Sequence, residues 1–172
     1  THCISSAASD VYKRQTCDRV NGVLTVYTDS TMRIPIKTIR VSVGKAGTET
    51  PTGTWTMHRA GRWQELMGPS WGQYGTHVVN GIFVHSVACG QANSYNLPVG
   101  EYLRLGNPAS HGCIRACVAD AKWVWDNCNG SKIRIFDGTY TSNEALKGPL
   151  GRKALTPLRG SKNFDPTDPA CK

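Results

Sequence analysis

Short runs of β-forming residues dominate the first third of this chain. Residues 23–27 and 32–36 are rich in β-branched side chains, residues 39–43 alternate between apolar and polar, and residues 54–58 form a further short run. Alternation with a period of two is typical of a half-buried strand. Pro35 places the second run at the edge of a sheet, because proline lacks the N–H that a central strand donates. The pattern therefore predicts four strands.

The middle of the chain is less regular. Residues 59–75 are rich in Gly, Pro and Trp and predict a long surface loop, a type of segment that is often functional. Residues 76–79 and 82–85 flank an Asn-Gly pair, which is a strong signal for a two-residue hairpin turn. Residues 102–105 predict one more short strand.

A helical pattern replaces the β pattern after Cys113. Apolar residues recur there at intervals of four and three, which gives one apolar face on a helix; they are Ile114, Val118, Ala121, Trp125 and Cys128. The pair Asn129-Gly130 is a helix stop signal. Residues 132–136 alternate again and predict a last strand. We therefore expect a helix that starts at Cys113.

Many short strands with one prominent helix predict a mainly β domain, closed into a sandwich or barrel-like core. We assign this domain to residues 17–140 and expect residues 141–172 to form a largely irregular tail. Residues 1–15 resemble the conceptual translation of a sequencing-library adapter, so they are excluded from the fold prediction. A natural disordered N-terminus is the alternative for this segment.

The net charge of +8 is spread along the chain. A basic surface suits polyanions, including the anionic polymers of bacterial walls. No Lys/Arg run with interleaved aromatic residues occurs, which argues against nucleic acid as a partner. The sequence contains no apolar stretch long enough to span a membrane and no visible secretory signal.

Seven cysteines in 172 residues indicate an oxidising compartment, and the odd number leaves one thiol unpaired or bridged to another chain. Cys113 is the natural free thiol. Cys117 and Cys128 would lie about 16 Å apart on a continuous helix, so they cannot pair with each other. We expect pairs of Cys89 with Cys117 and of Cys128 with Cys171, with Cys17 either unpaired or bonded to Cys171 instead.

The segment Ser110-His111-Gly112-Cys113-Ile114-Arg115 carries the candidate chemistry. A helix N-terminus lowers the pKa of a thiol, so the expected helix start would activate Cys113 as a nucleophile. His85, at the end of an apolar strand, is the candidate base. A backbone carbonyl near Ser86 or Val87 would fix its tautomer, because no acidic partner is evident.

The neighbouring residues have candidate supporting roles. The backbone N–H groups of Gly112 and Cys113 suit an oxyanion hole. His111 would orient the loop, bind substrate or polarise its carbonyl. Ser110 would bond to the loop or the substrate, or cap the helix. Arg115 would bind a substrate carboxylate or hold the loop, and Ser86 is assigned with it to substrate binding.

These residues also suggest a rival zinc site formed by His111, Cys113, Cys117 and Cys128. The Cys spacing matches no common zinc motif, and a continuous helix would keep Cys117 too far from Cys128 for one metal to bind both. We therefore expect no metal and no cofactor.

Several segments together resemble the catalytic domain of the L,D-transpeptidases (the YkuD family), which remodel peptidoglycan. The resemblance covers roughly residues 21–137 and rests on Thr50-Pro51-Thr52-Gly53-Thr54-Trp55, Phe83-Val84-His85-Ser86-Val87, the segment 105–115 and the helix pattern at 120–127. The interval between His85 and Cys113 is longer than in many members. We interpret this inserted loop, between His85 and Leu105, as a lid held by the Cys89–Cys117 bridge.

The resemblance implies a secreted, cell-wall enzyme that acts on peptidoglycan stem peptides. Cys113 would attack the carbonyl of the third residue of a tetrapeptide stem, a diamino acid, and expel the terminal D-alanine. The thioester would pass to the amine of another stem and form a 3→3 cross-link. Transfer to water would make the same site an L,D-carboxypeptidase. A catalytically silent wall-binding domain, in which Cys113 is bridged or unreactive, is the alternative from another class.

Overall fold

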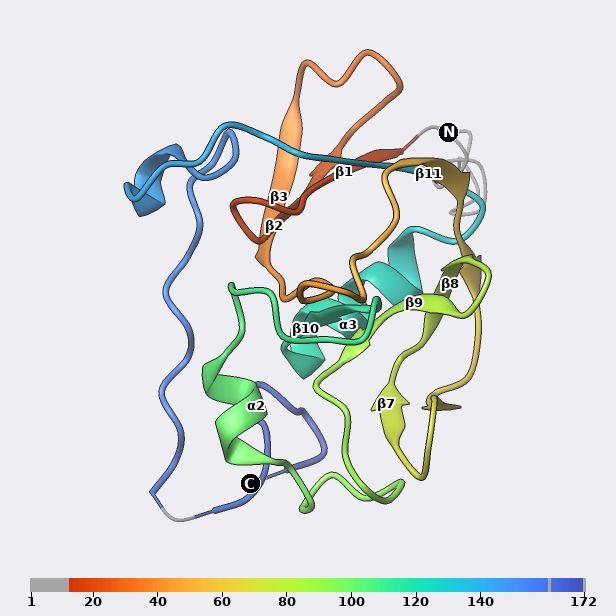
Figure 1. Ribbon diagram of the computed structural model, residues 1–172, viewed down its shortest axis with the longest axis vertical. Helices are drawn as coiled ribbons and strands as arrows, with labels where there is room; N and C mark the ends of the chain where they lie inside the picture. The colour runs from red at the N-terminus through yellow and green to blue at the C-terminus, as the bar shows by residue number, and fades with distance from the viewer. Residues whose placement is uncertain (1–12, 161, 172) are drawn as a thin grey trace, which may run out of the picture.

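The computed structural model of the chain describes residues 13–160 and 162–171. Its first sheet has the strand order β3-β2-β1-β11-β4, in which β1 and β11 are parallel and the other neighbours are antiparallel. The strands are β1 (Arg14–Asp18), β2 (Val23–Tyr27), β3 (Pro35–Arg40), β4 (Gly53–Thr56) and β11 (Lys132–Phe136). The predicted mainly β architecture is confirmed (Figure 1).

The strand β1 corrects the exclusion of residues 1–15. It is the central strand of the first sheet, and both Gln15 and Cys17 are fully buried. The Gln15 side chain accepts a hydrogen bond from Ser131 Oγ at 2.8 Å, and its Nε2 donates to the sulfur of Cys128. Residues 14 and 15 therefore belong to the folded sheet, while residues 1–12 of the excluded segment lie outside the described residues.

The edge position of Pro35 is confirmed, because β3 is an edge strand and begins at that residue. The structure has one strand over residues 35–40 where the pattern predicted two, at 32–36 and 39–43. The predicted strand at 54–58 is also divided. Its first part is β4 of the first sheet, and the chain then enters β5 (His58–Arg59) of a second sheet.

The second sheet has the order β10-β9-β8-β5. Its other strands are β8 (Thr76–Val79), β9 (Ile82–Ser86) and β10 (Ile114–Ala116). β8 and β9 form the predicted Asn-Gly hairpin, in which Asn80 has the positive φ of 50° that such turns require. β10 lies parallel to β9, and this pairing joins two segments about thirty residues apart in sequence.

Two segments have a different structure from the predicted one. The predicted surface loop at 59–75 contains a small hairpin of β6 (Trp63–Glu65) and β7 (Trp71–Gln73). The predicted strand at 102–105 is instead the end of a short helix, α2 (Val99–Leu103). Pro98 precedes this helix, where its missing N–H costs no hydrogen bond.

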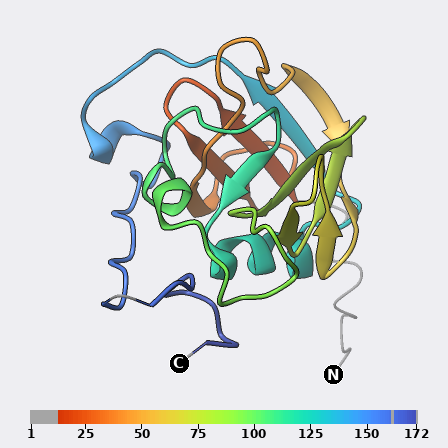
Figure 2. The same cartoon turned by 60° about the horizontal axis from the view of Figure 1, so that its bottom comes forward.

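The prominent helix, α3 (Val118–Asn127), begins five residues later than predicted. Ile114, the first residue of the predicted helical period, is instead fully buried on β10, as is Ala116 two positions later, which is the period of a strand. The first helical N–H groups bond to the C-terminal segment: Val118 N–H donates to Asp165 Oδ2 at 2.8 Å, and Ala119 N–H to Thr167 Oγ1. α3 packs against β9 and β10 (Figure 2).

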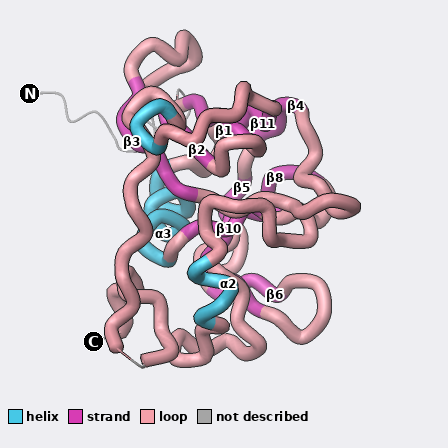
Figure 3. The backbone as a smooth tube through the Cα atoms, turned by 60° about the vertical axis from the view of Figure 1, so that its left-hand side comes forward, coloured by secondary structure: helices cyan, strands magenta, loops and turns pink. Residues whose placement is uncertain are grey.

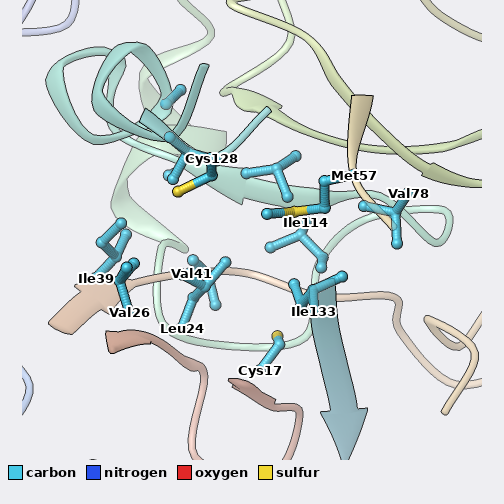
Figure 4. Packing of buried hydrophobic residues seen from close by; sticks show 14 of the residues in the cluster. Cys17, Leu24, Val26, Ile39, Val41, Met57, Val78, Ile114, Cys128 and Ile133 are labelled. Atoms are coloured by element: carbon cyan, nitrogen blue, oxygen red, sulfur yellow. The ribbon is translucent and has the colours of Figure 1, made fainter. Parts of the chain in front are cut away.

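The main core lies between the two sheets and α3. Buried side chains from the first sheet point toward those of the second sheet and the end of α3 (Figure 4). The residues labelled there are Cys17, Leu24, Val26, Ile39, Val41, Met57, Val78, Ile114, Cys128 and Ile133. Burial of these apolar side chains is the main stabilising term for the fold.

The C-terminal segment is largely irregular, with one short 3₁₀ helix, η1 (Glu144–Leu146), and it runs along one side of the domain (Figures 1 and 3). It is firmly packed. Arg152 is buried and donates to the carbonyl oxygens of Asn21 and Gly106, and Phe164 is 1% exposed. None of the helices in the described part of the chain is long and apolar enough to cross a membrane.

Candidate active site

Cys113 lies directly before β10, beside the β9 strand that carries His85. Its sulfur accepts a hydrogen bond from the Phe83 N–H at 3.5 Å, and its thiol donates to the Gly81 carbonyl at 3.6 Å. The thiol is free. Cys113 is therefore placed by a strand pairing and not by a helix start, which corrects the sequence prediction.

His85 is 1% exposed, and its two ring nitrogens have different environments. Nδ1 lies 2.5 Å from the carbonyl oxygen of Ser86. Because a carbonyl only accepts, Nδ1 carries the proton and Nε2 carries the lone pair. Nε2 is buried and has no hydrogen-bond partner among the residues that the structure describes. This is the tautomer of a general base, and the expected carbonyl that fixes it is that of Ser86.

The strand register brings both residues to one cavity. Ile114 pairs with Val84 and Arg115 with His85, so Cys113 is offset from His85 by two positions on neighbouring strands and faces the same side of the sheet. Both side chains line a cavity of about 310 Å³. Its other lining residues are Leu66, Met67, Ser70, Gly81, Ile82, Ala88, His111 and Arg115.

Burial sets the protonation of both groups. It lowers the pKa of His85 to about 4, against a smaller opposing effect of the Ser86 carbonyl. It also raises the pKa of the Cys113 thiol, although the Phe83 N–H and the Arg115 charge oppose this shift. The resting site therefore holds a neutral thiol and a neutral imidazole. The expected low thiol pKa is wrong for this state, because Cys113 is not at a helix N-terminus.

Hydrogen bonds within the segment Ser110–Arg115 hold Cys113 in place. Ser110 Oγ donates to the Cys113 carbonyl at 2.6 Å and accepts the Gly112 N–H at 3.1 Å. Ser110 is thus bonded to the loop, and Cys117, not Ser110, is the cap residue of α3. The Gly112 N–H is already used, so only the Cys113 N–H remains of the two expected oxyanion donors.

Thr50 is the first residue of the segment Thr50–Trp55 that carries part of the family resemblance. It is a positioning residue, a role that the sequence did not predict. It is fully buried. Its Oγ1 donates to the Gly112 carbonyl at 2.6 Å and accepts the Gly44 N–H at 2.9 Å. Gly112 has a φ of 121°, and a β-carbon there would lie 2.8 Å from Ile82 Cδ1. A glycine and a bonded carbonyl therefore fix the turn before Cys113.

The two charged or titratable candidates beside Cys113 both line the cavity. His111 is exposed at its rim. Arg115 donates through Nη1 to Glu101 Oε2 on α2 at 2.7 Å, which holds the guanidinium in place. Its Nε is buried without a protein partner. Arg115 thus has one side bonded to the fold and one donor left over.

Ser86 does not reach the cavity, which corrects its assignment to substrate binding. Its hydroxyl accepts the Gln73 N–H at 2.9 Å and donates to the Val87 carbonyl at 3.1 Å. Its side chain is 1% exposed, and Ser86 is not among the cavity residues. Ser86 therefore acts through its carbonyl, which holds the ring of His85.

The wall of the cavity opposite the strands comes from the β6–β7 hairpin, which contributes Leu66, Met67 and Ser70. From the loop between His85 and Leu105, the predicted lid, only Ala88 lines the cavity. No local sequence pattern indicates that these apolar hairpin residues lie beside Cys113. The Gly/Pro/Trp-rich composition of residues 59–75 predicted only a long surface loop, a type of segment that is often functional.

The predicted disulfides are not formed. Cys89, Cys117, Cys171 and Cys17 all have free thiols. The Cys117 thiol donates to Asp120 Oδ2 at 3.2 Å, and the Cys89 thiol to the Val87 carbonyl. The Cys89–Cys117 bridge that was expected to hold the lid is therefore wrong. Within residues 13–160 and 162–171, no three His, Cys, Asp or Glu side chains are grouped as a metal site would require.

Comparison with known proteins agrees with the geometry. A family model described as the L,D-transpeptidase catalytic domain (YkuD) matches residues 16–148. The curated Bacillus subtilis protein YciB, whose name assigns it provisionally to the L,D-transpeptidases, is 59% identical over 27 residues, which are 16% of this chain and 14% of that protein.

Solved structures share the fold at low sequence identity. A fused zinc-dependent amidase, peptidase and peptidoglycan-binding protein of Clostridium acetobutylicum has a TM-score of 0.56 at 20% identity, covering 77% of this chain and 58% of that one. An L,D-transpeptidase of Mycobacterium smegmatis has a TM-score of 0.52 at 22% identity, covering 72% and 58%. One of Mycobacterium tuberculosis has a TM-score of 0.56 at 19% identity, covering 73% and 57%. The chain thus spans less than two thirds of these proteins.

Proposed function

Because this chain belongs to the family of the L,D-transpeptidase catalytic domain, we propose that it is a cysteine acyltransferase that forms 3→3 cross-links between peptidoglycan stem peptides. The observation that carries the proposal is the pair at the cavity: a free Cys113 thiol and a buried, neutral His85 whose Nε2 lacks a partner. A nucleophile with an unbonded base facing the same cavity is the arrangement that acyl transfer requires.

The reaction begins from the neutral pair. His85 Nε2 takes the proton of the Cys113 thiol as the sulfur attacks the carbonyl carbon of the third stem residue. The resulting imidazolium returns this proton to the nitrogen of the terminal D-alanine, whose C–N bond breaks, and a thioester remains on Cys113. An acceptor amine then attacks the thioester, loses a proton to His85 and releases the thiol.

The developing oxyanion needs donors that are not already bonded. We assign this role to the Cys113 N–H, since the Gly112 N–H bonds to Ser110. We assign a supporting role at the same oxygen to His111, which is exposed and lines the cavity. The unpartnered Nε–H group of Arg115 would donate a hydrogen bond to a carboxylate or carbonyl oxygen of the donor stem, while Glu101 fixes the guanidinium.

The substrate places the enzyme at the cell wall, outside the cytoplasmic membrane. The net charge of +8 favours a wall that carries anionic polymers and free stem carboxylates. Stem peptides are the expected partners on this basis. Neither a cofactor nor a metal takes part in the proposed steps.

Intact-mass spectrometry tests the proposal directly. The protein is incubated with a tetrapeptide stem, with and without a second stem as acceptor. We expect a mass increase on Cys113 equal to the donor minus D-alanine, and a cross-linked dimer when the acceptor is present. Release of D-alanine without a dimer would identify an L,D-carboxypeptidase instead.

The control is Cys113→Ala, which removes the nucleophile and leaves the packing around it. We expect it to fold normally and to release no D-alanine. Turnover retained by this variant would contradict the role of Cys113 as the nucleophile. No adduct and no D-alanine release with the unmodified protein would favour the catalytically silent wall-binding domain.

A further inference from the structure

A second cavity, of about 210 Å³, lies between β3, the start of α3 and the C-terminal segment. It shares no lining residue with the cavity at Cys113. The C-terminal segment enters it with residues 153–156 and with Thr167. This segment is held there by bonds from Arg40 Nε to the Lys153 carbonyl and from the Ala119 N–H to Thr167 Oγ1.

Positive charge exceeds negative charge around this cavity. Its lining includes Lys37, Arg40 and Lys153 but only one carboxylate, Asp120. Asp120 is already bonded to Lys37 Nζ at 2.7 Å. Lys153 is exposed and has no ion pair with any residue that the structure describes. At least one cationic group is therefore left without an acidic partner.

The charge of Arg40 is only partly balanced. Its Nη2 binds Glu144 at 3.0 Å, but the same carboxylate also binds Lys147 and Arg152, so three cations share one acid. Burial, and after it the charge of the nearby Arg152, lowers the pKa of Arg40. An anion in the cavity would relieve this repulsion.

Thr38 supplies an independent observation, a buried hydroxyl without a hydrogen-bond partner among the described residues. It lines the cavity and is 7% exposed, yet its Oγ1 has no hydrogen-bond partner. A buried hydroxyl without a partner is destabilising, because it has lost its bonds to water. Thr38 and Arg40 are two positions apart on β3, so their side chains are on the same face of the strand, and a ligand bonded to the Thr38 hydroxyl would lie on the side of Arg40.

The start of α3 adds a favourable field. The helix has ten residues, and Ala119 and Asp120 at its first turn line the cavity. The positive end of a helix dipole favours an anion. The first two N–H groups already bond to Asp165 and Thr167, so α3 contributes its field more than direct donors.

We infer that this second cavity binds an oxyanion group, a phosphate or a carboxylate, between Thr38, Arg40 and Lys153. Its volume is below the range of pockets that enclose whole ligands, which suits one charged group of a larger molecule. Only the source of this group rests on the proposed function. The source is either a phosphate of a wall polymer or a carboxylate of a stem peptide.

Amide NMR titration tests the site with inorganic phosphate at constant ionic strength. We expect saturable shifts at the N–H groups of Thr38, Ala119 and Lys153. Thr38→Val, which keeps the side-chain shape, should weaken binding about fivefold. Lys153→Ala should weaken it by a similar factor. The matched control is Lys132→Ala on β11, which removes an exposed charge outside the cavity and should leave binding unchanged.

The source is identified by two further probes, glycerol phosphate and N-acetyl-D-alanine. Saturation by the first assigns a polymer phosphate, and saturation by the second assigns a peptide carboxylate. Saturation by inorganic phosphate alone would overturn the assignment to a wall component. Absence of saturable shifts with all three probes, or equal weakening by Lys132→Ala, would overturn the site itself. Phosphate binding should be unchanged in Cys113→Ala, because the two cavities share no lining residue, so this test and that of the proposed function fail separately.

Discussion

The ring of His85 occupies the space that a side chain at Gly72 would need. A β-carbon at position 72 would lie 2.5 Å from Nδ1 of His85 and 2.8 Å from its Cγ. A real β-carbon essentially never comes this close to an atom to which it is not bonded. Gly72 is in β7, so the hairpin that lines the cavity also supports the ring from behind.

The substitution Gly72→Ala should therefore push the ring away from the Ser86 carbonyl and misdirect Nε2. We expect the turnover number for a stem peptide to fall by about 10²-fold, the scale of a general base, with a loss of about 1–3 kcal/mol in the free energy of unfolding. Gly90→Ala is the matched control, since a β-carbon there meets only Asn96 Nδ2 at 3.9 Å. Steady-state kinetics and urea denaturation measure both effects. Equal activity in the two variants would show that the ring has room to move.

The lowered pKa of His85 predicts an unusual dependence on pH. The base works only when neutral, so kcat/KM should fall as the pH decreases through about 4 and should stay level from about pH 5 to pH 8. A pH–rate profile measures this. An acid limb near 6.5 would indicate that the imidazole is solvated in the working enzyme.

The same group should make stability depend on pH. Between pH 6.5 and 4 an unfolded chain protonates His85 while the folded chain does not, so the free energy of unfolding falls as the pH falls through this window. The full effect is about 3 kcal/mol. His85→Gln removes it, so the difference between the two proteins should shrink at acid pH. A constant difference would contradict the burial of a neutral ring.

Thr50 should be necessary for the position of Cys113. Thr50→Val keeps the shape of the side chain but leaves the Gly112 carbonyl and the Gly44 N–H without their partner. We expect a loss of about 1–3 kcal/mol in stability and a clear fall in the rate of thiol acylation. Thr50→Ser, which keeps the hydroxyl, should restore most of both. Failure of serine to restore the rate would show that the methyl group, and not the hydrogen bonds, matters.

The two histidines at the cavity should differ in their effect on the rate. His85→Ala should lower the turnover number by about 10²–10⁴-fold at neutral pH, and His111→Ala by much less, because His111 is exposed and lies at the rim. Matched pH–rate profiles of the two variants measure this. The reverse order would exchange their roles.

Truncation tests the structural role of residues 13–15. Removing residues 1–15 takes away Arg14 and Gln15, and with them the pairing of these residues with β2 and β11 and the bonds of Gln15 to Ser131 and Cys128. We expect this variant to be less stable than one that starts at Lys13 by about 2 kcal/mol or more. Thermal denaturation of the two proteins compares them. Equal melting temperatures would show that this end of β1 is dispensable.

The sequence pattern predicted strands where their signal is local. It missed the elements whose structure depends on a partner segment distant in the chain. The β8–β9 hairpin carries its own turn signal, and β2 and β11 carry their own alternation. β1 has almost no apolar side chains, and it is a strand because β2 and β11 lie on either side of it. The start of α3 depends on Asp165, which is 47 residues away from Val118.

The site shows the same division. The segment Ser110–Arg115 and the apolar strand predict Cys113 and His85 as the reacting pair from residue types alone. The orientation of His85 by Ser86, the support from Gly72 and the bond from Thr50 to Gly112 all join segments that only the fold brings together. The assignment of Ser86 to substrate binding is corrected because its neighbour His85 faces the cavity and Ser86 does not.

The weak basicity of the buried His85 imidazole also affects which nucleophile, amine or water, attacks the thioester. A base with a pKa of about 4 cannot remove a proton from an alkylammonium ion, whose pKa is near 10. An acceptor amine must therefore lose its extra proton to the solvent before it enters, whereas water enters neutral at any pH. The ratio of cross-linking to hydrolysis should accordingly increase with pH, so the acidity of the surroundings would set how much of the acylated enzyme builds the wall and how much trims it.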